Sequence, residues 1–356
     1  MGRAKNKWLI ILTSALLLVV AVAGSGRESE ARAVTLNGAG ASFPYPLYSK
    51  WLEEYRKVAP DVAIDYQSIG SGGGIRGILD QTLDFAGSDA PMKDDQLANA
   101  PGEIFHIPTV AGAVVITYNL KGVEKGLKIT PDVLADIFLG NIKMWNDKRI
   151  TSINPDVDLP AQPIIVVHRS DGSGTTNIFT DYLSSISSTW KAKVGKGTSV
   201  EWPTGIGAKG NEGVSGAVKQ TPGAIGYVEL AYAIQNRLPF ALLKNRAGRF
   251  IEPSLETTTA AAAGAAANMP EDMRVSIVNA PGEDAYPIAG YTYLLVYKEQ
   301  KDKVKGEELV KFLWWAIHDG QKFARELLYA PLPENVAKLA EKKIKQISYK
   351  GGPLYK

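Results

Sequence analysis

Three short segments of the chain combine glycine with hydroxyl side chains, and each follows a run of residues typical of a β-strand. Glycine lets backbone N–H groups come close to a ligand. A helix N-terminus adds free N–H donors and a partial positive charge. The three segments are residues 38–44, 70–74 and 171–175, with the hydroxyl groups of Ser42, Ser71, Ser173 and Thr175. Because all three lie between a strand and a helix, they predict an anion-binding site.

Two charged side chains next to these segments narrow the kind of anion. Arg169 offers a planar fork of donors suited to an oxyanion, and Asp171 could hold that fork in place; a plain surface ion pair is the alternative. Asp89 ends another strand, where it could also cap a helix. Beside an anion, Asp89 would accept a hydrogen bond only from a guest that carries a proton. This favours phosphate over sulfate and leaves arsenate open.

The same segments disfavour a nucleotide site and an enzyme. None ends in the Gly-Lys-Ser/Thr sequence of a phosphate-binding nucleotide loop. Ser173 and His168 are the one pair that suggests a hydrolase, but His168 ends a strand and the chain has no Gly-x-Ser-x-Gly elbow. We therefore expect binding without catalysis and without a cofactor, with a hydrolase as the alternative.

Composition excludes several other classes of protein. The chain of 356 residues contains no cysteine and three histidines, which rules out disulfides and disfavours a zinc or redox-metal site. Residues 1–33 carry five of the 40 basic and two of the 37 acidic residues, so the remainder has 35 of each and is neutral. A neutral chain lacks the electrostatic basis for binding nucleic acid.

The N-terminus has the pattern of an export signal. Arg3, Lys5 and Lys7 precede an uncharged, largely apolar stretch over residues 8–23, which is short for a membrane span. Small residues at alternate positions place the cleavage after Ala23 or after Ala33. The alternative is an uncleaved membrane anchor.

Strand and helix patterns alternate along the rest of the chain. Predicted strands cover residues 34–36, 62–66, 83–86, 110–118, 164–167, 224–228 and 291–297, and predicted helices cover 45–58, 75–81, 176–183 and 309–328. The alanine-rich residues 257–267 predict a surface helix with an irregular start. This order indicates an α/β fold with a sheet rich in parallel strands, whose ligand crevice lies at the carboxyl ends of the strands.

Seven segments resemble the phosphate-binding proteins of bacterial phosphate ABC importers. They are residues 38–51, 69–74, 84–91, 108–115, 168–176, 222–229 and 282–288. The resemblance implies the type II architecture of periplasmic binding proteins, with two lobes that are each a mixed sheet flanked by helices and a hinge of two segments. With crossings near residues 118–120 and 284–287, residues 34–118 and 286–356 would form lobe one and residues 119–285 lobe two.

The resemblance also implies a function and a set of contacts. The exported protein would be a periplasmic monomer that captures inorganic phosphate between its lobes and delivers it to the membrane permease, without nucleic acid. The implied ligand residues are Ser42, Phe43, Ser71, Asp89, Arg169, Ser173, Gly174 and Thr175, supported by Asp171 and Gly72. The family commonly has Thr where this chain has Ser42, which keeps the hydroxyl group.

Overall fold

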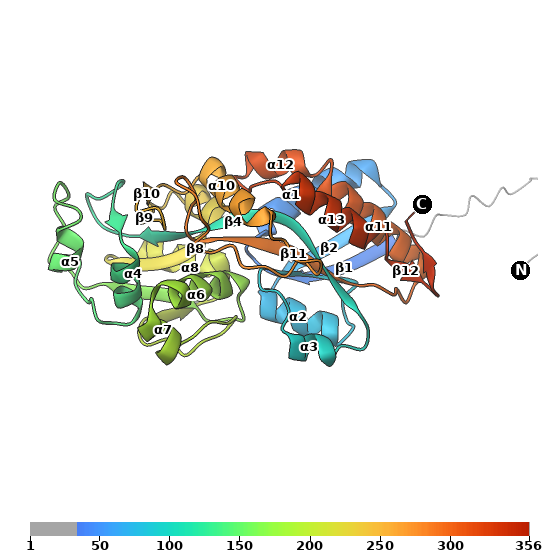
Figure 1. Cartoon of the computed structure of the whole chain (residues 1–356), viewed down its shortest axis with the longest axis horizontal. Helices are drawn as coiled ribbons and strands as arrows, with labels where there is room; N and C mark the ends of the chain where they lie inside the picture. Colours follow the sequence, from blue (N-terminus) through green and yellow to red (C-terminus); the bar gives the residue numbers. More distant parts are fainter. Residues whose placement is uncertain (1–33, 356) are drawn as a thin grey trace, which may run out of the picture. The chain divides into compact units, whose positions relative to one another are not determined.

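The computed structural model describes residues 34–355 (Figure 1). The predicted export signal and both cleavage positions, after Ala23 and after Ala33, lie outside the described residues. Within the described part, none of the helices has the length and apolarity that crossing a membrane requires.

The core of the fold is a mixed sheet of eight strands, as the α/β prediction requires. Their order across the sheet is β2 (Val62–Ser68), β1 (Val34–Gly40), β3 (Phe85–Ser88), β11 (Ala289–Tyr297), β4 (Ile104–Tyr118), β8 (Ala224–Glu229), β6 (Ile165–Arg169) and β7 (Ile206–Ala208). Pairing is parallel for β2, β1 and β3 and again for β8, β6 and β7, and antiparallel around β11 and β4. The two parallel groups are therefore joined by an antiparallel centre.

Strand β4 connects the two groups. It is fully buried along its length, which explains its nearly continuous apolar sequence. Residues Ile104–Ala113 pair with β11, whereas Val114–Tyr118 pair with β8. The chain thus changes partner inside β4, four residues before the predicted crossing at residue 118. The division into lobes at residues 118 and 286 stays a prediction.

Helix α1 (Tyr45–Val58) has the predicted bounds, because its apolar residues recur at helical spacing and Pro46 lies in its first turn. It contacts β2, and in Figure 1 it lies with α11 (Lys303–Ile317) on the opposite side of these strands from α2 (Ser71–Leu79). The other helices are α3 (Asp94–Ala98), α4 (Pro131–Phe138), α5 (Lys148–Thr151), α6 (Gly174–Ile186), α7 (Ser188–Lys193), α8 (Gly210–Gln220), α9 (Leu230–Gln235), α10 (Leu255–Ala266), α12 (Gln321–Glu326) and α13 (Glu334–Ile344). There are two small sheets among the described residues. One contains β5 (Lys128–Ile129), β9 (Leu242–Lys244) and β10 (Phe250–Ile251), and the other contains β12 (Ser348–Tyr349) and β13 (Gly352–Pro353).

The single helix predicted over residues 309–328 is wrong. The chain forms α11 and then α12, with a break at residues 318–320. The indole Nε1 of Trp51 in α1 donates a 2.8 Å hydrogen bond to the carbonyl of Gly320, which fixes the break against a distant helix. Apolar periodicity continues across the break, so the pattern alone did not reveal it.

The alanine-rich segment forms the predicted helix but differs from its prediction at the start. Helix α10 starts regularly, because the Ser254 hydroxyl accepts from the Thr257 amide and the Thr257 hydroxyl accepts from the Ser254 amide. Its Thr258, Ala261 and Ala262 side chains are buried. Small side chains allow close packing on this face, whereas Thr259, Ala263 and Gly264 are exposed, so α10 is a surface helix as predicted.

Large aromatic side chains fill the core on both sides of the sheet centre. Trp51, Trp145 and Trp190 are fully buried. Burial of these rings supplies the stability that a chain without disulfides needs.

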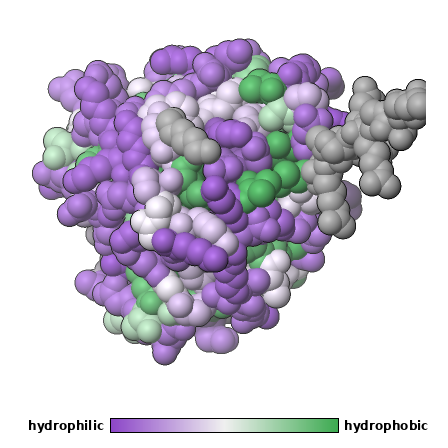
Figure 2. All heavy atoms as spheres, turned by 90° about the vertical axis from the view of Figure 1, so that its right-hand side faces the viewer, coloured by the Kyte–Doolittle hydropathy of each residue, from purple (hydrophilic) through white to green (hydrophobic). Residues whose placement is uncertain are grey.

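The face shown in Figure 2 is covered mainly by hydrophilic side chains, with hydrophobic ones in small groups between them.

Candidate functional site

The three glycine- and hydroxyl-rich segments all lie at carboxyl ends of strands, as predicted. They connect β1 to α1, β2 to α2 and β6 to α6. The glycines of the first segment have a packing role, however. Gly40 belongs to β1, has a φ of 144°, and leaves no room for a Cβ against the Gly87 carbonyl of the neighbouring strand β3. Its conformation serves the close approach of two strands.

The other two segments form the first turns of helices. Gly70, with a φ of 82°, is the N-cap of α2, so the predicted loop over residues 71–74 is already helical. Ser173 is the N-cap of α6, and its hydroxyl accepts from the Thr176 amide at 3.0 Å. The amides of Ser71, Gly174 and Thr175 are therefore among those that a helix leaves without an intrahelical acceptor.

The starts of α2 and α6 lie against each other. The Gly72 amide donates to the Gly172 carbonyl at 2.8 Å. A Cβ at Gly174 would lie 2.5 Å from both Asp89 Oδ2 and Ser71 Oγ. The second and third segments, about 100 residues apart in the sequence, thus form one compact group.

Arg169 and Asp171 form the predicted pair. Arg169 Nε donates to Asp171 Oδ1 at 2.7 Å and Nη2 donates to Oδ2 at 2.5 Å. The Arg169 side chain is only 1% exposed, which excludes a surface ion pair. Burial alone would raise the pKa of Asp171, but the hydrogen bonds and charge of Arg169 and the Gly210 amide outweigh it and lower the pKa. The pair therefore stays ionised.

Asp89 is a buried carboxyl group surrounded by donors. It is 3% exposed, its Oδ1 accepts from Thr292 Oγ1 at 2.8 Å, and its backbone amide donates to Ser71 Oγ at 3.2 Å. Burial raises the pKa of Asp89 to about 7, although Thr292, the charge of Arg169 and the Ser71 hydroxyl each lower it. The alternative role as a helix cap is wrong, since α3 is capped at Lys93. Asp89 can hence take up or release a proton near neutral pH.

Ser42 and Phe43 are buried at the start of α1. The Ser42 carbonyl accepts from Tyr232 at 2.6 Å, and the Phe43 carbonyl accepts from Tyr329 at 2.7 Å. The Phe43 ring packs edge-on against Tyr329. These bonds orient the backbone before the first turn of α1, where the Phe43 amide precedes the N-cap Pro44.

Asn211 was not predicted from the sequence, although it lies at the centre of the group. Its backbone amide and Nδ2 donate to Ser42 Oγ at 3.2 and 2.9 Å, and Nδ2 also donates to Thr175 Oγ1 at 3.1 Å. Asn211 occupies the first turn of α8 directly after Gly210, three residues beyond the end of β7. That is a fourth strand–glycine–helix junction, and this repeated pattern was the signal that could have identified it.

Thr292 and Glu229 were missed as well. Thr292 lies in β11, more than 200 residues from the Asp89 that it contacts. Glu229 is fully buried, and its Oε2 accepts from the Ala231 amide at 2.7 Å and from Tyr329 at 3.0 Å. Burial raises the pKa of Glu229 well above its usual value, with the charge of Asp89 adding to the rise. Glu229 is thus a buried acid whose surroundings favour its protonated form.

His168 does not make the contact that a hydrolase needs. Its Nδ1 lies 3.1 Å from the Arg169 carbonyl, and its ring stacks on Trp202 at 4.8 Å between centroids. Ser173 Oγ is engaged with the Thr176 amide instead. Within residues 34–355 this serine and histidine do not form a nucleophile–base pair.

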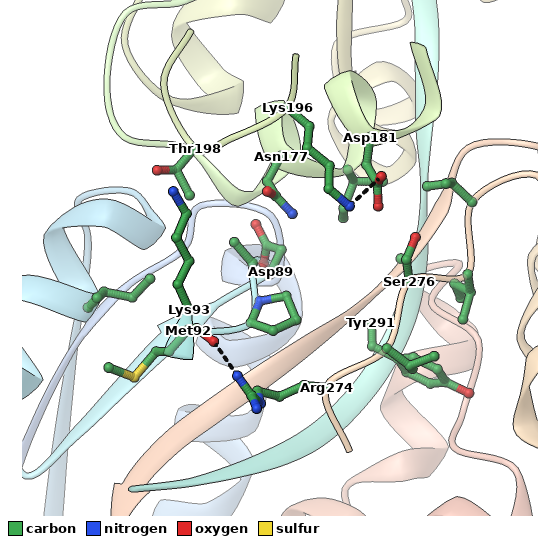
Figure 3. A pocket seen from close by; sticks show the side chains of 18 of the residues that line it. Asp89, Met92, Lys93, Asn177, Asp181, Lys196, Thr198, Arg274, Ser276 and Tyr291 are labelled. Carbon is green, nitrogen blue, oxygen red and sulfur yellow. Dashed lines mark hydrogen bonds and ion pairs between the residues drawn. The ribbon is translucent and has the colours of Figure 1, made fainter. Parts of the chain in front are cut away.

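A cavity of about 530 Å³ opens beside Asp89 (Figure 3). Lys93 points into it from one side, and on the other side Lys196 pairs with Asp181 at 2.8 Å. Of the predicted site residues, Asp89 and Gly72 line this cavity. The predicted site residues therefore border this cavity at Asp89 and Gly72, and the others do not line it.

Hydroxyl, amide and guanidinium donors thus gather around one carboxyl group with a pKa near neutrality. Such a set is typical of oxyanion recognition, because the donors face acceptor oxygens and the carboxyl group can accept one proton. The predicted residues Ser42, Ser71, Asp89, Arg169, Ser173, Gly174 and Thr175 are linked by direct contacts or through Asn211. Their contact with a ligand stays a prediction.

Comparisons with known proteins agree with this architecture. Residues 25–319 match the model of the PBP superfamily domain. The chain is 48% identical to the phosphate-binding protein PstS of Xylella fastidiosa over 88% of this chain and 85% of that one. It is 40% identical to PstS of Methanocaldococcus jannaschii over 95% of each chain.

The fold matches a solved structure at lower sequence identity. A high affinity periplasmic phosphate-binding protein (PfluDING) bound with phosphate superposes with a TM-score of 0.69, covering 87% of this chain and 93% of that one, at 22% identity. Like this chain, it has the two-lobed mixed α/β fold. The chain therefore belongs to the PBP superfamily and, within it, to the family of the PstS phosphate-binding proteins.

Proposed function

We propose that this protein captures inorganic phosphate and delivers it to the membrane permease of an ABC importer, without acting on it chemically. The observation that carries the proposal is the Asp89 carboxyl group, buried among the donors of two helix N-termini and Arg169. Its pKa of about 7 suits an exchange of a hydrogen bond with a singly protonated oxyanion. The names of the PstS relatives support phosphate as that anion.

In this proposal the predicted residues contact the phosphate oxygens directly. Ser42, Ser71, Ser173 and Thr175 donate from their hydroxyl groups, and the backbone amides of Phe43, Ser71, Gly174 and Thr175 donate as well. Arg169 pairs with the charge while Asp171 fixes its orientation. Asp89 accepts a hydrogen bond from the proton that phosphate carries. It repels sulfate, which has no proton to donate.

The proposal includes capture between two lobes, residues 34–118 with 286–356 and residues 119–285. Ser42, Ser71 and Asp89 would then come from lobe one, and Arg169, Ser173 and Thr175 from lobe two. Because only the closed arrangement brings both donor sets to one anion, phosphate would favour closure. We place the mature monomer in the periplasm after export, where it meets the permease.

Titration calorimetry of residues 34–356 with phosphate, sulfate and arsenate tests the proposal. We expect saturable binding of phosphate, binding of arsenate and no measurable heat from sulfate. The variant Asp89→Asn should bind sulfate, because an amide can donate to the oxygen that a carboxylate repels. Equal affinity of the unaltered protein for sulfate and phosphate would refute the proposed role of Asp89.

Absence of catalysis is tested separately with a chromogenic phosphate ester. We expect no turnover above background from the purified protein. Turnover that Ser173→Ala abolishes would instead support the hydrolase alternative.

A further inference from the structure

The buried side chain of Asn211 forms hydrogen bonds to two hydroxyl groups of the predicted site. Its side chain is fully buried, and both protons of its amide nitrogen are used: one hydrogen bond reaches Ser42 Oγ at 2.9 Å and the other Thr175 Oγ1 at 3.1 Å. Its backbone amide adds a second bond to Ser42 Oγ at 3.2 Å. One asparagine therefore contacts two hydroxyl groups that come from distant parts of the chain.

The orientation of the Asn211 amide follows from its oxygen. The Glu229 backbone amide, which can only donate, lies 2.9 Å from Asn211 Oδ1. A rotated side chain would place Nδ2 against this donor, so Oδ1 must face Glu229. Nδ2 must consequently face Ser42 and Thr175 and donate to both.

Counting lone pairs then determines what the two hydroxyl groups can do. Ser42 Oγ accepts twice, from the backbone amide and from Nδ2 of Asn211. Thr175 Oγ1 also accepts twice, from Asn211 Nδ2 and, at 3.4 Å, from Arg169 Nη1. A hydroxyl oxygen has two lone pairs. Each of these hydroxyl groups has its acceptor capacity filled and retains only its proton for another partner.

We propose that Asn211 is a positioning residue that makes Ser42 and Thr175 obligatory donors to the bound phosphate. This inference rests on the proposed function. The oxygens of singly protonated phosphate are rich in lone pairs, and its single proton is assigned to Asp89. A hydroxyl group that presented a lone pair would repel the anion, and filling those lone pairs removes that orientation in the closed arrangement, where Asn211 contacts Ser42.

The same contacts join the two halves of the site. Ser42 precedes α1, whereas Thr175 and Asn211 lie in the first turns of α6 and α8. Asn211 thereby fixes the position of one donor from each predicted lobe relative to the other. Its loss should disorder both donors at once.

The test compares Asn211→Asp with the unaltered protein by phosphate calorimetry. Aspartate has nearly the same shape, but it accepts where asparagine donates, so the Ser42 and Thr175 protons would turn toward it and away from the ligand. With two hydrogen bonds to a charged guest lost, we expect phosphate affinity to fall at least ~100-fold. Asn141→Asp, an exposed asparagine that donates to Asp136, is the matched control and should leave affinity unchanged.

A double-variant cycle separates positioning from general destabilisation. Asn211→Ala should weaken phosphate binding at least ~10-fold in the unaltered background but much less in a Ser42→Ala background, because one of the hydroxyl groups it orients is already gone. A merely structural role predicts that the two losses multiply. Asn211→Ala also replaces Asn211→Asp if the latter does not fold, as judged by urea unfolding.

The outcomes distinguish this inference from the proposed function. If the unaltered protein does not bind phosphate, the proposed function fails. If the unaltered protein binds phosphate and Asn211→Asp binds it equally well, or the losses in the cycle multiply, the positioning role of Asn211 is overturned while phosphate binding stands.

Discussion

Replacing Asp89 by asparagine should remove a pH-dependent cost from the free protein. Burial raises the pKa of Asp89 from 3.8 to about 7. At pH values between 3.8 and about 7, the folded state binds more protons than the unfolded state. The free energy of unfolding therefore falls as pH rises through this range. Below about pH 3, well under both pKa values, both states are protonated and this cost is absent.

The size of the effect follows from the shift in pKa. One pKa unit corresponds to ~1.4 kcal/mol, so a shift of three units costs about 4 kcal/mol once Asp89 is fully ionised. Between pH 4.5 and pH 8 the unaltered protein should lose about 3 kcal/mol of unfolding free energy through Asp89 alone. This is an upper value, because any opening that admits water to the carboxylate lowers the cost.

Urea unfolding without phosphate, at pH 4.5 and pH 8, measures this difference. Asp89→Asn has no carboxyl group at this position, so its unfolding free energy should fall less between the two pH values than that of the unaltered protein, by up to about 3 kcal/mol. Asp95→Asn, at an exposed position of α3, is the control and should follow the unaltered protein. Glu229 is present in all three proteins, and because the charge of Asp89 adds to the rise in its pKa, its contribution in Asp89→Asn changes in the same direction as the predicted difference.

The refuting result is equally specific. If Asp89→Asn loses as much stability between pH 4.5 and pH 8 as the unaltered protein, Asp89 is not the desolvated acid that the structure indicates. The argument that this carboxyl group exchanges a hydrogen bond with a protonated anion would then lose its physical basis.

Four further predictions concern binding and stability. Arg169→Ala should lower phosphate affinity at least ~100-fold in calorimetry, because it also leaves Asp171 unpaired, whereas exposed Lys191→Ala should have no effect. Gly174→Ala should abolish measurable phosphate binding, since its Cβ would lie 2.5 Å from Asp89 Oδ2; retained affinity would contradict this packing. Ser254→Ala should lower the urea unfolding free energy by ~1 kcal/mol through loss of the α10 cap and leave phosphate affinity unchanged. Phosphate affinity should change less than ~3-fold between 50 and 500 mM sodium chloride, because the ligand contacts are buried.

The sequence sufficed for the parts of the site that local patterns determine. A strand followed by glycine and then by an amphipathic helix places its junction at the carboxyl end of a sheet, and β1–α1, β2–α2 and β6–α6 follow this rule. Arg169 and Asp171, two residues apart, pair as predicted because Arg169 ends β6 and Asp171 lies in the short turn that follows it. The α/β fold itself was predictable for the same reason.

Contacts between distant segments could not be predicted in this way. The Thr292 hydroxyl reaches Asp89 because β11 inserts antiparallel between β3 and β4, a position in the sheet that periodicity does not encode. Glycine patterns are also ambiguous: Gly40 serves strand packing, whereas Gly174 serves a helix start beside Asp89. The break after α11 depends on a hydrogen bond from Trp51, which is 269 residues away.

The charge balance of the site connects these local and distant contacts. Arg169 is buried, but Asp171 compensates its charge through two short hydrogen bonds, and burial raises the pKa of Glu229 well above its usual value. Net positive charge is therefore not what distinguishes this group of residues, just as the chain after residue 33 has equal numbers of acidic and basic residues. An anion in this site would depend on directed donors, namely helix amides and oriented hydroxyl groups. Directed groups distinguish guests by the number and position of their protons, which overall charge cannot do. A site proposed to bind phosphate and reject sulfate would therefore gain more from the buried carboxyl group of Asp89 than from additional lysines.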